Sequence, residues 1–402
     1  MSPLRFENSK LALPLDPREF YPDHVEVGDE AVINQDGLDA VINSLAGRGW
    51  RTLGPVVRDG AIVHGDVRSS ADLPVGWHDH AEPGRYRVSR GEDSDLFSWA
   101  VGPASWKSEF FKPSETVWTT EFTDGTLTLS EPDERPIPVA IIGARPCELA
   151  ALSVLDRVLR DGAVPDDRYT ARRDGAFVIV AECGTPSGTC FCTSMGTGPA
   201  ADANFDLALT ELTDGSHRFY VRVGSQAGAD VLGDVVHHPA EDADRAARQG
   251  VIAGATEHMG RRLDTEGLPA LLARNLEHPR WDEVAERCLS CGNCTLVCPT
   301  CFCSDVRDVT DITGTVERQR RWASCFDVDH SYLHGGAVRP TTSSRYRQWM
   351  THKLSTWWDQ FGESGCVGCG RCIAWCPVGI DITEEAAAIR ATDGAASDGK
   401  TP

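Results

Sequence analysis

The sequence predicts a multi-domain α+β/α protein, with an N-terminal mixed α/β domain and a C-terminal α-helical domain. Two observations support this fold class. A short apolar run, a helical segment and a second apolar run follow one another between residues 138 and 182, an order typical of a βαβ unit. Cysteines are absent from the first 146 residues, whereas eleven of the 15 lie between Cys288 and Cys376, so the chain changes character in its last third.

The length of 402 residues accommodates two or three domains. We expect an α/β domain over residues 1–275, a helical domain over residues 276–390 and a disordered tail over residues 391–402. The tail is small and polar, so it has too few apolar residues to pack against the rest of the chain.

The first elements follow from local patterns. Apolar residues at helical spacing predict a helix within residues 36–50. The Asp59-Gly60 turn between two apolar stretches predicts a hairpin over residues 51–65. The apolar runs 138–144 and 176–182, with a helical segment between them, predict two parallel strands and their crossover helix.

Later elements are predicted in the same way. Residues 205–212 and 217–224 read as an antiparallel pair of strands around a turn. Residues from about 239 to 286 read as helices. Between the two cysteine-rich segments, Tyr346 and Phe361 belong to an apolar stripe at helical spacing, which predicts a further helix.

Charge and composition indicate which partners the chain can bind, where it resides and what its cysteines do. The chain has 60 Asp and Glu against 39 Lys and Arg, a formal net charge of −21, which disfavours binding to nucleic acids or anionic membranes. No secretion signal and no long apolar run is visible, so we expect a cytoplasmic protein. In that reducing compartment, 15 cysteines favour metal ligation over disulfides.

Two segments share one cysteine pattern, C-x2-C-x2-C-x3-C-P, which is typical of paired [4Fe–4S] clusters in which the fourth cysteine of each motif ligates the other cluster. The predicted ligands of the first cluster are Cys288, Cys291, Cys294 and Cys376, and those of the second are Cys366, Cys369, Cys372 and Cys298. Zinc is the alternative, but zinc sites use two cysteine pairs with a longer spacer.

Four further cysteines follow the predicted βαβ strands. Cys147 comes after the first strand and Cys183 after the second, and the carboxyl ends of parallel strands meet at one edge of a sheet. Cys190 and Cys192 lie in the glycine-rich loop that follows. We therefore predict a third [4Fe–4S] cluster there. Buried free thiols, a zinc site and a thiol active site are the alternatives.

Three cysteines remain, Cys301, Cys303 and Cys325. They could hold another cluster if His330 or Asp327 supplied a fourth ligand, or they could be thiols that merely neighbour the clusters. The sequence has no catalytic constellation of His, Asp and Ser. No catalytic residues are therefore predicted. The sequence also lacks the glycine-rich fingerprint by which a Rossmann fold binds NAD or FAD, so we expect no such cofactor in this chain.

A basic stretch stands out from the acidic background. Seven Lys and Arg lie between Arg318 and Lys353, against Asp327 and Asp329. Basic groups near anionic clusters raise their reduction potentials, and they could also dock an acidic partner. An ordinary solvated helix face is the alternative.

The motifs CLSCGNCTLVCPTCFC and CVGCGRCIAWCP, with GARPCELAAL upstream, resemble the iron–sulfur β subunit of cytosolic NAD(P)-linked [NiFe] hydrogenases of group 3b, the sulfhydrogenases. A sister family with the same cysteine plan occurs in anaerobic sulfite reductase. The resemblance covers most of residues 136–390. It implies an iron–sulfur subunit that relays electrons between an NAD(P)H-linked flavin subunit and the hydrogenase small subunit, with nickel on the large subunit.

The main hypothesis is therefore a non-catalytic electron-transfer subunit of a hydrogenase complex. A second hypothesis is the electron-input subunit of an anaerobic sulfite or polysulfide reductase, which sirohaem in the partner would reveal. A third, from another class, is an iron–sulfur redox sensor that controls a binding partner. A zinc-held scaffold is a fourth, which elemental analysis would distinguish.

Overall fold

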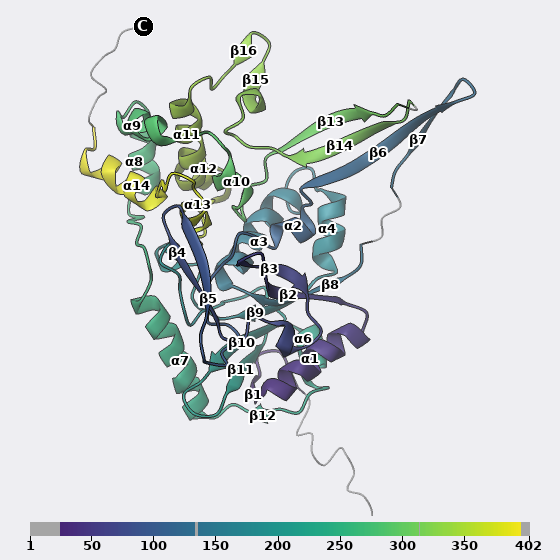
Figure 1. Ribbon diagram of the computed structural model, residues 1–402, viewed down its shortest axis with the longest axis vertical. Helices are drawn as coiled ribbons and strands as arrows, with labels where there is room; N and C mark the ends of the chain where they lie inside the picture. Colours follow the sequence, from purple (N-terminus) through teal and green to yellow (C-terminus); the bar gives the residue numbers. More distant parts are fainter. Residues whose placement is uncertain (1–24, 133–135, 313, 395–402) are drawn as a thin grey trace, which may run out of the picture.

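A computed structural model describes residues 25–132, 136–312 and 314–394, and the statements below concern these residues. An eight-stranded sheet with its helices forms one end of the molecule, and a set of short helices that carries most of the cysteines forms the other end (Figure 1). Two long hairpins project sideways between these parts. No helix in the described ranges is both long and apolar enough to span a membrane.

The central sheet has the strand order β12-β1-β11-β10-β9-β8-β2-β3. Strands β2, β8, β9 and β10 are parallel to their neighbours within this group, and the outer strands pair antiparallel. The strands are β1 (Glu30–Ile33), β2 (Arg51–Arg58), β3 (Ala61–Asp66), β8 (Val139–Ala144), β9 (Phe177–Ala181), β10 (Leu207–Leu212), β11 (Arg218–Val223) and β12 (His238–Pro239).

Helices cover both faces of this sheet. Successive residues of a strand point to opposite faces, and in the central strands both sets are apolar, so each face packs against helices. Ile179 packs with α1 and α6, whereas Val178 and Val180 pack with α3 and α4. The helices are α1 (Gln35–Gly47), α3 (Pro146–Leu159), α4 (Asp167–Asp174), α6 (Gln226–Leu232) and α7 (Asp242–Glu257), the last of which packs beside β10 and β11. The result is a three-layered α/β/α arrangement.

Most predicted elements of the N-terminal part are confirmed. The helix within residues 36–50 is α1, which Asn34 caps by accepting a hydrogen bond from the Gly37 amide. The hairpin over residues 51–65 is β2–β3, and Asp59 and Gly60 both have the positive φ that this tight turn requires. The βαβ unit is β8–α3–β9, and the antiparallel pair is β10–β11.

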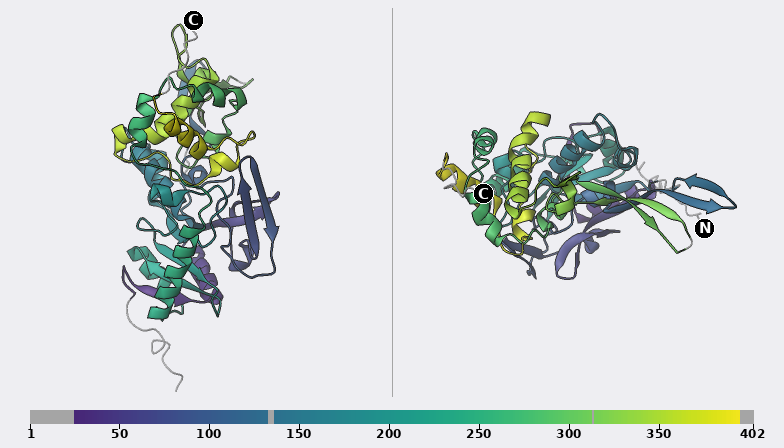
Figure 2. Two further views of the ribbon diagram at one scale, coloured as in Figure 1. Left: turned by 90° about the vertical axis from the view of Figure 1, so that its left-hand side faces the viewer. Right: turned by 90° about the horizontal axis from the view of Figure 1, so that it is seen from above.

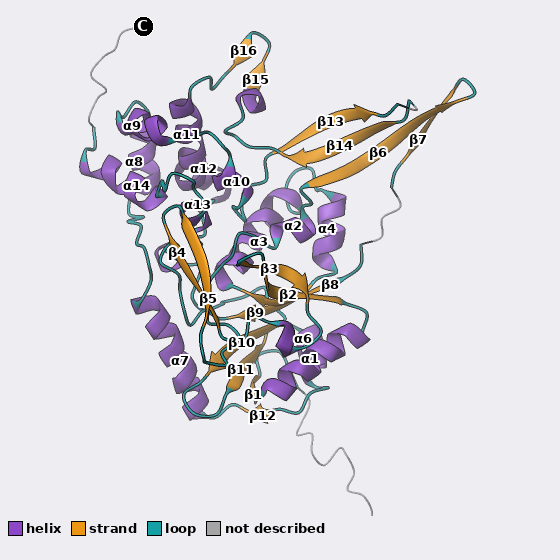
Figure 3. Ribbon diagram, viewed as in Figure 1, coloured by secondary structure: helices purple, strands orange, loops and turns teal. Residues whose placement is uncertain are grey.

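The cysteine-rich end consists of short helices and loops (Figure 3). Its helices are α8 (Leu268–Arg274), α9 (Arg280–Arg287), α10 (Asn293–Leu296), α11 (Thr342–Thr351), α12 (Trp357–Phe361), α13 (Arg371–Ala374) and α14 (Ile382–Ala391). A π-helical turn (His352–Thr356) joins α11 to α12, so the predicted helix between the cysteine motifs is confirmed. The helical reading of residues 239–286 also holds for α7, α8 and most of α9. The predicted tail lies mostly outside the described residues.

The helical domain predicted over residues 276–390 contains strands between residues 304 and 337. There β13 (Ser304–Thr310) and β14 (Val316–Trp322) join β6 (Ser114–Thr123) and β7 (Thr126–Ser130) in a second sheet of order β13-β14-β6-β7 (Figure 2). A small hairpin follows, β15 (Tyr332–Leu333) with β16 (Gly336–Ala337). The edge of β6, far away in the sequence, supplies the backbone partners that make β14 a strand.

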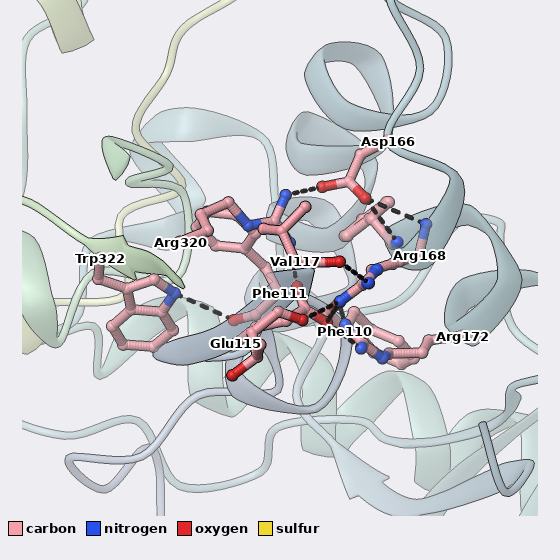
Figure 4. A network of polar contacts seen from close by, with 11 residues as sticks. Phe110, Phe111, Glu115, Val117, Asp166, Arg168, Arg172, Arg320 and Trp322 are labelled. Carbon is pink, nitrogen blue, oxygen red and sulfur yellow. Dashed lines mark hydrogen bonds and ion pairs between the residues drawn. The ribbon is translucent and has the colours of Figure 1, made fainter. Parts of the chain in front are cut away.

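Buried ion pairs fix this second sheet to the body of the molecule (Figure 4). The carboxylate of Glu115 on β6 is 3% exposed and pairs with Arg172 of α4 and, at 2.6 Å, with Arg320 of β14. Arg320 also pairs with Asp166 before α4. Arg168 donates to the carbonyls of β6. Residues on both sides of the predicted boundary at 275 therefore pack as one network.

Two smaller elements complete the fold. Strands β4 (Trp77–Glu82) and β5 (Arg85–Arg90) form a hairpin whose Tyr86 contacts Trp375 of the cysteine-rich end at 5.2 Å between ring centroids. The short helix α2 (Lys107–Phe110) precedes β6 and buries Lys107 toward Cys301. Both elements connect the N-terminal part to the cysteine motifs.

Candidate iron–sulfur centres

The two cysteine motifs adopt the same local conformation. Each begins in a loop and enters a helix of four residues, α10 or α13, at a Cys-Gly pair. Gly292 and Gly370 cap these helices with φ of +74° and +73°, a left-handed conformation that a side chain at this position would strain. A Cβ at Gly370 would also lie 2.2 Å from the Thr189 carbonyl oxygen. The turn brings the cysteines before and after each glycine to one side.

The first thiol group comprises Cys288, Cys291, Cys294 and Cys376. These four line one small cavity together with Tyr346, Trp349 and one further cysteine, Cys372. Burial raises the pKa of the Cys288 thiol, and Cys376 and Cys291 raise it further. The fourth cysteine of the second motif thus lies with the first three of the first motif. Cys291 is exposed, so this group reaches the surface.

The second thiol group comprises Cys298, Cys366, Cys369 and Cys372. Burial raises the pKa of Cys372 well above its ordinary value, and the Cys366, Cys369 and Cys298 thiols add to this shift. Burial likewise raises the pKa of Cys366 to about 12. Cys298 and Cys369 of this group are buried, Cys366 and Cys372 are partly exposed, and the crossing between the motifs is reciprocal.

The third thiol group comprises Cys147, Cys183, Cys190 and Cys192, all of which are buried. Cys147 lies in the first turn of α3, and Cys183 follows β9 at the same end of the sheet. Burial raises the pKa of Cys190 well above its ordinary value, and Cys183 and Cys192 raise it further. Residues from two adjacent strand ends and one loop therefore meet, as the sequence pattern suggested.

The three thiol groups lie in a row. The Cys294 thiol of the first group interacts electrostatically with Cys372 of the second. The Cys369 thiol of the second group interacts in the same way with Cys147 and Cys192 of the third. The second thiol group is thus the middle one.

Buried hydrogen-bond donors without a partner within the described residues surround these thiols. They are the Tyr346 hydroxyl, one guanidinium nitrogen of Arg371 and the indole nitrogens of Trp349 and Trp357. A buried donor needs an acceptor, and the sulfurs of an iron–sulfur cluster accept hydrogen bonds of this kind. All fifteen cysteines are free thiols, so the donor set suits iron–sulfur clusters. The residues present therefore fit the predicted cofactor.

The remaining three cysteines face a basic environment. Burial raises the pKa of Cys325 to about 12, Cys303 adds to this shift, and Lys353 opposes it. Asp327 accepts a hydrogen bond from the Ser324 amide. In the described part of the chain, no three Cys, His, Asp or Glu side chains are grouped to hold a single metal ion. The role of these cysteines as neighbours of the clusters stays a prediction.

Two lysines beside the second thiol group were not identified from their pattern. Lys353 appeared in the sequence only as the end of a basic stretch, and Lys107 lies some 190 residues from the cysteines that it faces. The π-helical turn directs Lys353 inward, where its ammonium donates to Cys298. Helix α2 buries Lys107. The sequence offered one sign of the position of Lys353: it is a charged residue within the otherwise apolar stripe between Tyr346 and Phe361.

Comparison with known proteins agrees with this geometry. The family model of a 4Fe-4S dicluster domain matches residues 287–380, which include the first two thiol groups. Sulfhydrogenase 2 subunit beta of Pyrococcus furiosus is 35% identical over 249 residues, which cover 60% of this chain and 71% of that protein. No solved structure matches the chain.

Proposed function

Because this chain belongs to the family of the sulfhydrogenase beta subunits and is an iron–sulfur electron-transfer subunit of a hydrogenase, we propose that its cysteines hold three [4Fe–4S] clusters in a relay. Such a cluster, when bound, supplies one-electron oxidation and reduction. The chain itself supplies the cysteine ligands, shields the clusters from solvent and places charged side chains beside them. No residue is assigned a catalytic role.

The proposed ligands are the three thiol groups as the structure brings them together. Cys288, Cys291, Cys294 and Cys376 would hold the first cluster, Cys298, Cys366, Cys369 and Cys372 the second, and Cys147, Cys183, Cys190 and Cys192 the third. The unpartnered donors of Tyr346 and Arg371 support this assignment, because each lies at two neighbouring groups.

The row of thiol groups is the observation that carries the proposal. Cys291 gives the first group an exposed end, and the third group is buried against the carboxyl end of the central sheet. Between them, Cys298 and Cys369 of the middle group are buried, and Cys372 packs partly buried against the apolar cluster. Clusters held by the three groups would therefore form one continuous series for one-electron transfer.

The partners follow from the family. A sulfhydrogenase beta subunit implies a hydrogenase complex of several subunits. We propose that this chain relays electrons between an NAD(P)H-linked flavin subunit and the hydrogenase small subunit, with nickel on the large subunit, in the cytoplasm. The sulfite reductase and redox-sensor hypotheses are not favoured, because the curated relative is a sulfhydrogenase subunit.

The test is to purify the complex without oxygen and to measure iron, acid-labile sulfide, nickel and zinc per copy of this chain. After subtraction of the iron in the partner subunits, we expect about twelve iron and twelve sulfide for this chain. About eight would contradict the third cluster. Zinc in place of iron, or sirohaem in place of nickel, would contradict the function.

A further inference from the structure

The second thiol group faces a buried positive charge. Lys353 is 6% exposed, and its ammonium donates hydrogen bonds to the Cys298 sulfur at 3.1 Å and to the Thr300 hydroxyl at 3.0 Å. Burial alone lowers the pKa of Lys353, but Cys298, Cys301 and Cys366 outweigh it and raise this pKa well above its ordinary value. The hydrogen-bond partners of this buried ammonium are thus a cysteine sulfur and a hydroxyl, and neither is a carboxylate.

A second ammonium approaches from the opposite end of the sequence. Lys107 is 2% exposed, and it donates to the Cys301 carbonyl at 3.1 Å and lies over the Trp322 ring at 3.7 Å. Burial lowers the pKa of Lys107, and the Cys301 and Cys298 thiols oppose this shift. Two buried cations thus flank one side of the second thiol group.

Neither lysine forms an ion pair with a carboxylate of the described chain. Burying a charge without a counter-charge is costly, so two such lysines require negative charge nearby. The sulfurs of the second thiol group, with the cluster that they would hold, can supply it.

The other two thiol groups have a different balance of charge. The third group faces the buried cations Arg145 and Arg371, but Asp79 and Glu148 face it too, so two positive charges are matched by two carboxylates. The first group faces Arg345, but its Cys291 is exposed and solvent screens charges there. Among the three groups, the two buried lysines that lack a carboxylate partner lie at the middle one.

We propose that Lys353 and Lys107 make the cluster held by Cys298, Cys366, Cys369 and Cys372 the most easily reduced of the three. This inference rests on the proposed function. Reduction adds one electron, taken from a partner subunit of the complex, and no bond forms or breaks. Nearby positive charge and an N–H···S hydrogen bond both stabilise the more negative, reduced state. The middle of the relay is then the place where a single electron resides.

The test is a redox titration of the full chain, purified without oxygen and poised with dithionite, followed by electron paramagnetic resonance. Cys366→Ser identifies the signal of the second thiol group. Lys353→Met removes the charge but keeps an unbranched side chain, and Lys353→Arg keeps the charge. Arg307→Gln, at an exposed arginine of β13, is the matched control for the loss of one positive charge.

We expect the signal that Cys366→Ser alters to develop first as the potential falls. In Lys353→Met, the ratio of reduced to oxidised cluster at the wild-type midpoint should fall at least about tenfold, which is about 59 mV for one electron. Lys353→Arg and Arg307→Gln should stay close to wild type. If another signal develops first, or if Lys353→Met leaves the midpoint unchanged, the inference is wrong.

A second variant covers the case in which Lys353→Met loses its iron. Lys107→Met must then lower the same midpoint, and an unchanged midpoint contradicts the inference. The proposed function fails differently, through zinc in place of iron or the absence of any [4Fe–4S] signal in the wild-type chain. The two failures are therefore distinguishable.

Discussion

The ammonium of Lys353 donates a 3.1 Å hydrogen bond to the sulfur of Cys298, although 55 residues separate the two in the sequence. This bond joins the π-helical turn before the second cysteine motif to the last cysteine of the first motif. The last cysteine of the first motif is thus held beside the segment that leads into the second motif by a contact of the protein itself.

The crossing predicts which variants are equivalent. Cys376→Ala, in the second motif, should remove the same cluster signal as Cys288→Ala in the first, because both thiols belong to one group. Cys366→Ala should remove a different signal. Electron paramagnetic resonance of the reduced variants distinguishes these outcomes. Loss of one common signal in Cys376→Ala and Cys366→Ala would show that the motifs do not cross.

The third thiol group predicts a defined loss of iron. Cys183→Ala should lower the iron content by about four per chain, because one [4Fe–4S] cluster loses a ligand. Cys325→Ala is the matched control, since it also removes a thiol, partly buried, outside the three groups. Iron and sulfide analysis measures both. Equal iron content in the two variants would argue against a third cluster.

Glu182, next to Cys183, should be a large contributor to stability. Its carboxylate is 1% exposed and accepts bonds of 2.7 Å from Arg222 and Arg248, which tie α7 and β11 to β9. Glu182→Gln should lower the free energy of unfolding by about 3 kcal/mol. This is the low end of the range for breaking a buried ion pair, because the side chains of both arginines are partly exposed to solvent. Glu257→Gln, at the exposed end of α7, is the control for denaturant unfolding.

The same carboxylate predicts a dependence of stability on pH. Burial raises the pKa of Glu182, but hydrogen bonds from Arg248 and Thr210 outweigh it, so the pKa lies below its ordinary value. The carboxylate therefore stabilises the fold above its unfolded pKa of about 4.3, and this contribution is lost as the pH falls through the lower folded value. Melting temperatures between pH 7 and acid should converge for wild type and Glu182→Gln. Parallel curves would contradict this.

Removing the clusters should unfold the cysteine-rich end before the central sheet. The segments around Cys294 and Cys372 contain only four-residue helices, and their thiols are part of the local packing. The central sheet has its own apolar core around Ile142 and Ile179. Hydrogen exchange of the iron-free chain should show lost protection around α10 and α13 and retained protection in β8 and β9. Equal protection in the loaded and iron-free chains would contradict this dependence.

The sequence predicts what local patterns encode. Leu38, Val41, Ile42 and Leu45 at helical spacing identify α1, and the spacing of cysteines identifies the motifs. It could not predict β14, which is a strand because β6 pairs with it across some 200 residues and because Glu115 neutralises Arg320. Nor could it place Lys107 beside Cys301, since that contact depends on how two distant parts of the chain pack.

The relay itself is tested most directly by separating the two half-reactions of the complex. In a complex that carries Cys372→Ser in this chain, hydrogen-dependent reduction of a viologen dye at the hydrogenase subunits should persist. Hydrogen-dependent reduction of NAD(P)+ should fall to background, because a ligand of the middle thiol group is changed. If both activities persist at wild-type rates, electrons do not pass through this chain and the account is wrong.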